Sequence, residues 1–219
     1  MKLGVLAGTG QEGRGIALRL AKAGCEVLLG SRRRSRAAGA ASELNRLLGD
    51  GARIRGALNQ EVAARSAVLF VASPFAAAAD LVARCSPHAA PEATWVDVTV
   101  PVSFDSGRVR LASLEAPSGS EQVAAALPDP DALVAALKTV PARLLGEVAA
   151  PLDCDVFVCG NSVRRKCEVA ELLSPWPGVR TVDAGPLEVA RTLERMSALL
   201  IGINRRYRVH GSRFRVVGL

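Results

Sequence analysis

Aromatic residues are scarce in this chain: its 219 residues include five Phe, two Trp and one Tyr. Proteins that bind single-stranded nucleic acids stack the bases on aromatic side chains, so the low aromatic content argues against that kind of partner. The formal net charge is nevertheless +7, and a basic surface attracts anionic ligands. We therefore expect small anionic cofactors, and not nucleic acid, as the partners of the basic side chains.

Histidine is also rare, and the cysteines show no metal-binding spacing. His88 and His210 are the two histidines, and neither belongs to a pattern typical of a catalytic triad or a metal site. The five cysteines are odd in number and include no CxxC pair, which supports neither a complete disulfide framework nor a common zinc site. We expect reduced, mostly buried thiols, no metal, and no catalytic side chain that the sequence can identify.

Long hydrophobic runs are missing as well. The least charged stretch, residues 66–79, is interrupted by Ser73-Pro74 and is too short to span a bilayer. Lys2 is followed by a glycine-interrupted strand pattern and not by the apolar region of a secretory signal. These features predict a cytoplasmic protein without a membrane partner.

Short apolar runs alternate with helical patterns, which predicts an α/β fold with a doubly wound parallel sheet of the Rossmann class. The expected strands are 2–7, 25–31, 53–58, 67–72, 94–100, 155–159 and 181–183, and the expected helices are 13–23, 35–48, 75–85, 162–173 and 188–204. Residues 102–119 resemble a loop, and residues 129–140 fit either a helix or a strand from Leu133 to Val140. We expect one domain over residues 1–183 and a C-terminal helix with a basic tail over residues 184–219.

The first expected strand leads directly into a GxGxxG motif, Gly8-Thr9-Gly10-Gln11-Glu12-Gly13, and a helical pattern follows. In this context the first glycine permits a tight turn, the second lets the backbone approach a pyrophosphate, and the third lets helix and strand pack closely. The phosphates would lie at the helix N-terminus, where free N–H groups attract anions. The motif therefore predicts a bound dinucleotide.

The end of the second expected strand indicates which dinucleotide is bound. NAD-specific proteins of this class usually carry an acidic residue there, but this chain has Ser31 followed by Arg32, Arg33, Arg34 and, two residues later, Arg36. Guanidinium groups bind phosphate in a bidentate manner. A solvated basic loop is the alternative, but arginines at a helix N-terminus oppose the helix dipole unless an anion compensates them. We therefore predict NADP as the cofactor.

Five sequence blocks, in order along almost the whole chain, resemble one enzyme family. They are Leu-Ala-Gly-Thr-Gly-Gln-Glu-Gly-Arg-Gly-Ile-Ala-Leu-Arg-Leu-Ala at 6–21, Gly-Ser-Arg-Arg at 30–33, Thr-Val-Pro-Ala at 139–142, Val-Cys-Gly-Asn at 158–161 and Asp-Ala-Gly-Pro-Leu at 183–187. The chain resembles the NADPH-dependent coenzyme F-420 reductases, also called F-420-dependent NADP oxidoreductases. The resemblance implies a homodimer with NADP at the carboxyl edge of the sheet. It also implies reversible hydride transfer between nicotinamide carbon 4 and deazaflavin carbon 5.

The resemblance further implies roles for residues around NADP. Thr9, Gln11 and Glu12 would contact the pyrophosphate and its ribose. The residues implied at the 2′-phosphate are Ser31, Arg32 and Arg36, with Arg33 nearby. The residues implied around the nicotinamide ribose follow two strands and are Ser73, Pro74, Val98 and Pro101. Both prolines would equally well be explained as simple strand ends.

For the deazaflavin, the resemblance implies two groups of residues. One contains Lys138 and Pro141, and the other is the Gly185-Pro186-Leu187 turn. The position of Lys138 is often His in the family. An ammonium could pair with the acidic ring system or with its phosphate, or the pocket could serve another acceptor. A plain turn before the last helix would explain Gly185, Pro186 and Leu187 nearly as well.

The C-terminal tail holds five arginines between Arg205 and Arg215. A solvated tail or contact with nucleic acid would explain them, and we hypothesise that some of them bind the phosphate and oligoglutamate of coenzyme F-420. Two other functions stay open at this point: an NADPH-dependent reductase of another small organic acceptor, and a non-enzymatic NADP-binding sensor. The fold alone cannot separate these possibilities.

Overall fold

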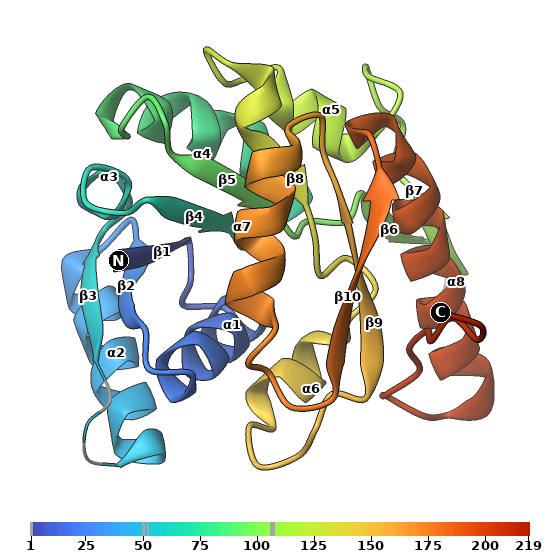
Figure 1. Ribbon diagram of the computed structural model, residues 1–219, viewed down its shortest axis with the longest axis horizontal. Coiled ribbons are helices and arrows are strands. Elements are labelled where there is room, and N and C mark those ends of the chain that lie inside the picture. The colour runs from blue at the N-terminus through green and yellow to red at the C-terminus, as the bar shows by residue number, and fades with distance from the viewer. Residues whose placement is uncertain (1, 50, 52, 106–107) are drawn as a thin grey trace.

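The structure is a computed structural model that describes residues 2–49, 51, 53–105 and 108–219. Its centre is a sheet of eight strands in the order β10-β9-β8-β5-β4-β1-β2-β3, shown in Figure 1. The strands are β1 (Lys2–Leu6), β2 (Glu26–Ser31), β3 (Ile54–Leu58), β4 (Val68–Val71), β5 (Thr94–Asp97), β8 (Leu133–Ala135), β9 (Cys154–Cys159) and β10 (Val179–Gly185). From β3 to β8 all neighbouring strands are parallel, in the strand order of dinucleotide-binding folds. The predicted α/β class is confirmed.

Helices cover both faces of this sheet, so its central strands are apolar on both sides. Leu3 and Val5 of β1 point into one core, and Leu6 points into the other. The first core includes residues of α1 (Gln11–Lys22), α2 (Arg34–Leu48), α6 (Ala142–Gly146) and α7 (Val163–Leu173). The second includes residues of α3 (Asn59–Ala63), α4 (Ala78–Cys85), α5 (Gly119–Ala124) and α8 (Ala190–Tyr207).

The last two strands reverse the direction of the sheet. β9 pairs antiparallel with β8 through Ala135 and Cys159, and β10 runs parallel to β9. A buried strand has the same hydrophobic pattern in either direction, so the sequence predicted a parallel arrangement throughout. As a result, the carboxyl ends of β9 and β10 lie at the opposite edge of the sheet from those of β1, β4 and β5.

Three segments differ from the sequence-based expectation. The stretch 102–119, expected to be a loop, contains an antiparallel hairpin of β6 (Val102–Asp105) and β7 (Arg108–Leu111), and β7 packs against α8 (Figure 1). The stretch 129–140 is neither a long helix nor a long strand: a 3-10 turn at Pro130–Ala132 leads into β8, which ends at Ala135. The expected last helix begins later, because a 3-10 turn at Leu187–Val189 precedes α8.

The C-terminal segment is integrated into the rest of the molecule. The boundary expected after residue 183 falls inside β10, and the first turns of α8 pack into the second core. All five cysteines are free, with Cys85, Cys154 and Cys159 buried, which confirms the expectation of mostly buried thiols. Within the described residues, no helix combines the length and the apolar character that crossing a membrane requires.

Candidate functional site

The glycine-rich loop connects β1 to α1 and leaves an open approach to the helix N-terminus. A Cβ on Gly13 would lie 2.5 Å from the Cα of Gly8, so only glycine lets the loop and helix approach this closely. At Gly10 a Cβ would meet no atom within 4 Å, so the backbone is open at that point. Gly10 also precedes α1 without a side-chain cap, which leaves the first N–H groups free for an anion. This geometry fits a pyrophosphate.

Asn59 holds the start of the glycine-rich loop by a hydrogen bond, and the sequence analysis did not identify it. Its buried side-chain oxygen accepts a hydrogen bond from the backbone N–H of Ala7 at 3.0 Å. A Cβ on Gly30 would lie 2.4 Å from the same oxygen, so β2, the loop and α3 meet at this residue. No local pattern marks Asn59, because its partner is 52 positions away in the sequence.

The Ser31–Arg36 segment borders a separate pocket of about 280 Å³ next to the loop. Its walls include Ser31, Arg32, Asn59, Gln60 and Arg84. The Ser31 hydroxyl accepts a hydrogen bond from the Arg33 backbone N–H at 3.3 Å. Arg84, on α4, is a second residue that sequence reasoning missed. Of the residues predicted to bind the 2′-phosphate, Ser31 and Arg32 line this pocket.

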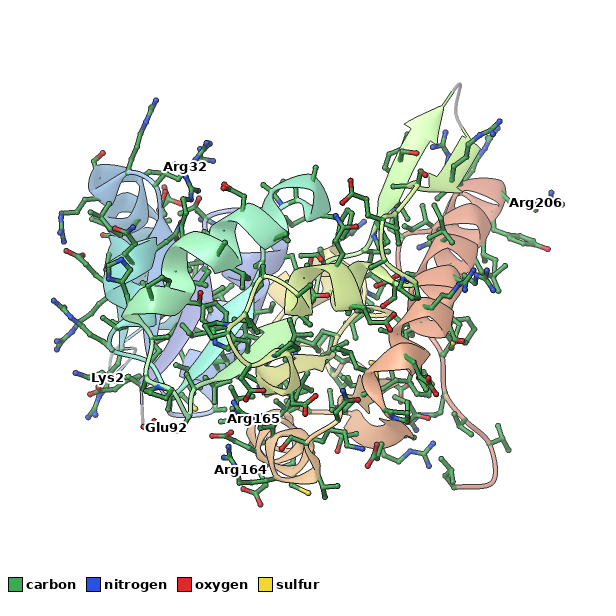
Figure 2. All side chains as sticks on the ribbon, turned by 90° about the horizontal axis from the view of Figure 1, so that it is seen from above. Lys2, Arg32, Glu92, Arg164, Arg165 and Arg206 are labelled. Carbon is green, nitrogen blue, oxygen red and sulfur yellow. The ribbon has the colours of Figure 1, made fainter. Side chains whose placement is uncertain are left out.

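The arginines of this segment differ in their partners. Arg34 forms an ion pair with Glu61. Among the residues described, Arg32, Arg33 and Arg36 form no ion pair and are exposed. In Figure 2 Arg32 and Arg206 lie far apart, and no arginine of the tail lines this pocket. Of Arg32, Arg33 and Arg36, Arg32 lines the pocket and the other two do not.

A cleft of about 310 Å³ opens at the carboxyl ends of β4, β5 and β8. The residues around it come from distant parts of the chain and include Glu12, Ser73, Pro74, Thr99, Lys138, Pro141, Ser197 and Leu200. The Ser73 hydroxyl oxygen is buried and has no hydrogen-bond partner in the described part of the chain. Such an oxygen is available to a ligand in the cleft. The structure thus brings together five predicted residues, Glu12, Ser73, Pro74, Lys138 and Pro141.

Two predicted neighbours of this cleft do not line it. The Val98 side chain is 1% exposed and belongs to the first core. Pro101 is buried, and its ring packs against Gly119. The residues between them, Thr99 and Val100, line the cleft instead; both follow the end of β5 at Asp97, where the regular alternation of a strand no longer applies.

A buried ionic cluster forms the floor of the cleft. The Lys138 ammonium lies 2.8 Å from an Asp97 carboxylate oxygen and 3.5 Å from a Glu194 oxygen, and it donates to the Thr99 carbonyl. The side chains of Lys138, Asp97 and Glu194 are at most 2% exposed. Burial lowers the pKa of Lys138, but the two carboxylates outweigh this effect and raise it. The expected pairing of Lys138 with an anionic ligand is corrected here, since the protein's own carboxylates already neutralise the ammonium.

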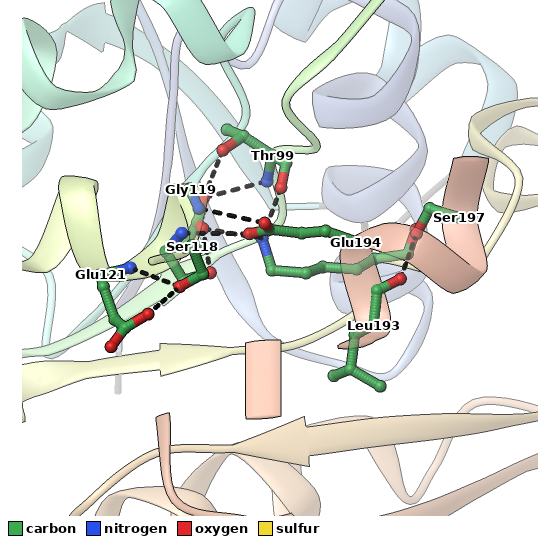
Figure 3. Close-up of polar contacts among 10 residues, drawn as sticks. Thr99, Ser118, Gly119, Glu121, Leu193, Glu194 and Ser197 are labelled. Atoms are coloured by element: carbon green, nitrogen blue, oxygen red, sulfur yellow. Dashed lines mark hydrogen bonds and ion pairs between the residues drawn. The ribbon is translucent and has the colours of Figure 1, made fainter. Parts of the chain in front are cut away.

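The same cluster holds α8 against the sheet. Glu194 accepts hydrogen bonds from the backbone N–H groups of Gly119 and Ser120 at 3.0 and 3.1 Å, as Figure 3 shows for Gly119. Ser197, one turn later, donates to the Lys138 carbonyl at 2.7 Å. These contacts place Ser197 and Leu200 at the cleft. Asp97 and Glu194 were missed by sequence reasoning, since isolated acidic residues carry no local signal.

Glu12 faces this cluster from the first turn of α1. Burial raises the pKa of its carboxyl from 4.5 to about 8; Lys138 opposes the rise and Asp97 adds to it. This shift favours the protonated carboxyl at neutral pH, where a carboxylate would be the usual form.

A second, more open cleft of about 800 Å³ adjoins the first. It is bordered by Gln11, Phe104, Arg143, Arg205, Arg208 and His210, and it shares Pro141 and Asn204 with the smaller cleft. Arg205 lies over the Phe104 ring, 5.9 Å from its centre. We call this second space the basic cleft.

The arginine-rich tail divides between two roles. Arg205 and Arg208 line the basic cleft. Arg213 and Arg215 instead bind the Asp153 backbone and side chain, respectively. The tail is also held by backbone contacts, since the Asp155 N–H donates to the Phe214 carbonyl at 2.9 Å. These contacts hold residues 213–215 of the tail next to β9.

The Gly185-Pro186-Leu187 turn does not reach either cleft. Pro186 and Leu187 border a different pocket with Glu121 and Asn161, and the Leu187 side chain is 4% exposed in the second core. Asn161 accepts a hydrogen bond from the Leu187 N–H at 3.0 Å. The expectation that this turn lines the ring is corrected, because β10 runs antiparallel to β8 and ends at the other edge of the sheet.

Comparisons with known proteins agree with this geometry. A family model described as "NADP oxidoreductase coenzyme F420-dependent" matches residues 2–101. The "F420-dependent NADP reductase" of Methanothermobacter thermautotrophicus is 37% identical over 224 residues, which cover 100% of this chain and 96% of the relative. That of Methanocaldococcus jannaschii is 33% identical, with 100% and 99% covered.

A solved structure is also similar over its full length. It comes from a protein of Arthrobacter sp. FB24 proposed to be an F420-dependent NADP-reductase, with a TM-score of 0.83, 28% identity and 99% of each chain covered. The similarity to the Methanothermobacter and Methanocaldococcus relatives extends over the whole chain. This chain therefore belongs to the family of F-420-dependent NADP reductases.

Proposed function

We propose that this protein transfers hydride reversibly between NADP(H) and the deazaflavin coenzyme F-420, directly from one cofactor to the other. The observation that carries the proposal is that three sites adjoin one another at the carboxyl ends of the central strands. They are the open glycine loop, the 310 Å³ cleft and the basic cleft. Full-length similarity to enzymes of that name supports it. When both cofactors are bound, they supply the hydride chemistry themselves.

The residues of this chain would bind and orient the two cofactors. The free N–H groups at the start of α1 would hold the pyrophosphate, and Ser31, Arg32 and Arg36 would hold the 2′-phosphate. Ser73 would offer its unpartnered hydroxyl to the nicotinamide end. Apolar walls at Pro74 and Leu200 would exclude water from the reacting carbons. Holding two rings in contact supplies much of the rate enhancement in such a reaction.

The basic cleft suits the anionic part of coenzyme F-420, its phosphate and oligoglutamate. Arg143, Arg205 and Arg208 line it, and guanidinium groups bind both phosphate and carboxylate. Contacts of this kind weaken as salt rises. A KM for coenzyme F-420 that stays independent of salt, and stays unchanged when Arg205 and Arg208 are replaced by Ala, would contradict this assignment.

The test of the function is a spectrophotometric assay with NADPH and oxidised coenzyme F-420. We expect the deazaflavin absorbance to fall with NADPH and much less with NADH. Arg32→Ala should raise the KM for NADPH, whereas Arg46→Ala, which changes an arginine in the last turn of α2, should not. No change in absorbance despite measurable NADPH binding would refute the proposal and favour another acceptor or a sensor.

We also propose a homodimer and a cytoplasmic location. Phe104 on the hairpin and Leu199 and Tyr207 on α8 are 62%, 55% and 70% exposed, and exposed apolar side chains of this size are typical of interfaces. Five free thiols are compatible with a reducing compartment. Sedimentation of the protein and of Phe104→Ser would test the dimer, since a monomeric wild-type protein would exclude it.

A further inference from the structure

Glu12 is the least explained charged group of the cleft. It lies in the first turn of α1 and borders the same 310 Å³ space as Ser73 and Lys138. In the described part of the chain, its carboxyl forms no hydrogen bond and no ion pair, unlike the carboxyls of Asp97 and Glu194. It is therefore the carboxyl that is left available to a ligand.

The charges around Glu12 are unbalanced. β5 contributes Asp97, α8 contributes Glu194, and the end of β8 contributes the Lys138 ammonium. Behind them Cys159 of β9 is buried, and in the adjoining basic cleft the charged groups are Arg143 of α6 and, from α8 and the residue after it, Arg205 and Arg208. Three carboxyls thus face one ammonium on the cleft floor.

Protonation of one carboxyl would resolve this imbalance. Asp97 and Glu194 have Lys138 between them and accept hydrogen bonds from Thr99, Ser120 and Gly119. Glu12 has no such donors among the residues that the structure describes. Protonating Glu12 therefore breaks no hydrogen bond or ion pair there, whereas protonating Asp97 or Glu194 would weaken those that they accept. The raised pKa of Glu12 agrees with this distribution.

We propose that Glu12 is the proton-exchanging group of the hydride transfer, giving its proton to the acceptor ring as NADPH is oxidised and recovering one in the reverse direction. This inference rests on the proposed function. It adds a catalytic residue to a site where the sequence indicated none.

The step balances in atoms and charge. The C–H bond at nicotinamide carbon 4 breaks, and its electron pair forms the new C–H bond at deazaflavin carbon 5. The acceptor ring gains negative charge at a ring nitrogen, which takes the proton as the O–H bond of Glu12 breaks. NADPH is oxidised and the deazaflavin is reduced. Solvent reprotonates Glu12 after the products leave.

Electrostatic attraction favours loss of the Glu12 proton in the same step that oxidises the nicotinamide. Oxidation makes the nicotinamide ring cationic, and the same step leaves Glu12 as a carboxylate in the same cleft. The two opposite charges stabilise each other in a space with little water. Reduced nicotinamide carries no positive charge, so Glu12 keeps its proton when NADPH is bound.

Proton release on binding tests the inference without any turnover. NADP⁺ or NADPH is added to weakly buffered protein at pH 7, and released protons are measured with an indicator dye. The 2′-phosphate is common to both ligands, so its own proton change cancels in the difference. We expect NADP⁺ to release about one proton more than NADPH.

Glu12→Gln keeps the size of the side chain but cannot exchange a proton in this range. This variant should lose the difference in proton release, whereas Glu188→Gln, at the opposite edge of the sheet, should retain it. With coenzyme F-420, kcat of Glu12→Gln should fall about 100-fold, the usual contribution of a positioned acid. We also expect the wild-type rate to decline above about pH 8, where Glu12 loses its proton. This decline should be absent in Glu12→Gln.

The two proposals fail in different ways. Equal proton release with NADP⁺ and NADPH in the wild-type protein would overturn the role of Glu12, even if the protein reduces coenzyme F-420. A one-proton difference in a protein that does not reduce coenzyme F-420 would support the response of Glu12 to the nicotinamide charge and overturn the proposed function. Because the first result needs only the wild-type protein, a variant that fails to fold cannot obscure it.

Discussion

Replacing Glu12 by Gln should change how the stability of the free protein depends on pH. The pKa of Glu12 is about 8 in the folded protein and 4.5 as the ordinary value. The folded state therefore binds more protons than the unfolded state between these two values. Under linkage, the free energy of unfolding of the wild-type protein falls as pH rises from about 4.5 to about 8.

The size of this effect follows from the two pKa values. Each tenfold change in proton affinity is worth about 1.4 kcal/mol, so the rise from 4.5 to about 8 sets a ceiling of about 5 kcal/mol. Glu12 borders a cleft that admits water, and water reduces such a penalty. We expect about 2 to 3 kcal/mol of wild-type stability, relative to Glu12→Gln, to be lost between pH 5 and pH 9.

Urea unfolding followed by tryptophan fluorescence is the assay. Both tryptophans, Trp95 and Trp176, are at most 3% exposed, so their emission reports the loss of the two cores. The wild-type protein, Glu12→Gln and the control Glu188→Gln are compared at pH 5, 7 and 9. Parallel pH profiles for the wild-type protein and Glu12→Gln would refute the reasoning and remove the stated electrostatic basis for a protonated Glu12.

Three further predictions address other parts of the site. Arg32→Ala should weaken NADPH binding about 10- to 100-fold, the value of a lost charge-assisted hydrogen bond, without changing NADH binding; calorimetry that shows equal losses for both would contradict the NADP assignment. Gly13→Ala should reduce NADPH affinity by a similar factor, because its Cβ would lie 2.5 Å from Gly8; binding at the wild-type level would show that the loop can move apart. Lys138→Met should destabilise the protein by about 3–5 kcal/mol in urea unfolding, because it leaves Asp97 without its buried counter-ion; unchanged stability would contradict the cluster.

The sequence predicted the parts of the site that are local. The turn from β1 through Gly8 to α1, and the end of β2 at Ser31, each occupy a few consecutive residues whose spacing follows from the chemistry of a bound dinucleotide. Periodicity gave the strand positions for the same reason. What it could not give was direction: β9 and β10 look alike whether they run with or against β8, and this placed Gly185 and Leu187 at the wrong edge.

The ionic cluster could not be predicted, because its members share no local pattern. Asp97 and Lys138 are 41 positions apart, and Glu194 reaches them only because α8 crosses from one sheet edge to the other. The hairpin was missed for a different reason. Its strands are four residues each, so the alternation of Val102 and Phe104 with polar residues is too short to stand out from a loop.

A buried lysine between two carboxylates and a glutamate without a partner among the described residues lie where the cofactors would meet. Elsewhere, the buried charged side chains are satisfied by backbone carbonyls or by an opposite charge, as at Arg19, Arg165, Lys166 and Asp155, and the exposed ion pairs of α1 and α4 are those expected of solvated helices. At the cleft, a lysine is almost completely buried, and burial raises the pKa of a glutamate in the first turn of α1 to about 8. Neither arrangement is needed for stability, because apolar residues of similar size would stabilise the fold as well or better. Since departures from local rules concentrate at functional sites, Glu12 and Lys138 are better explained by chemistry in the cleft than by packing.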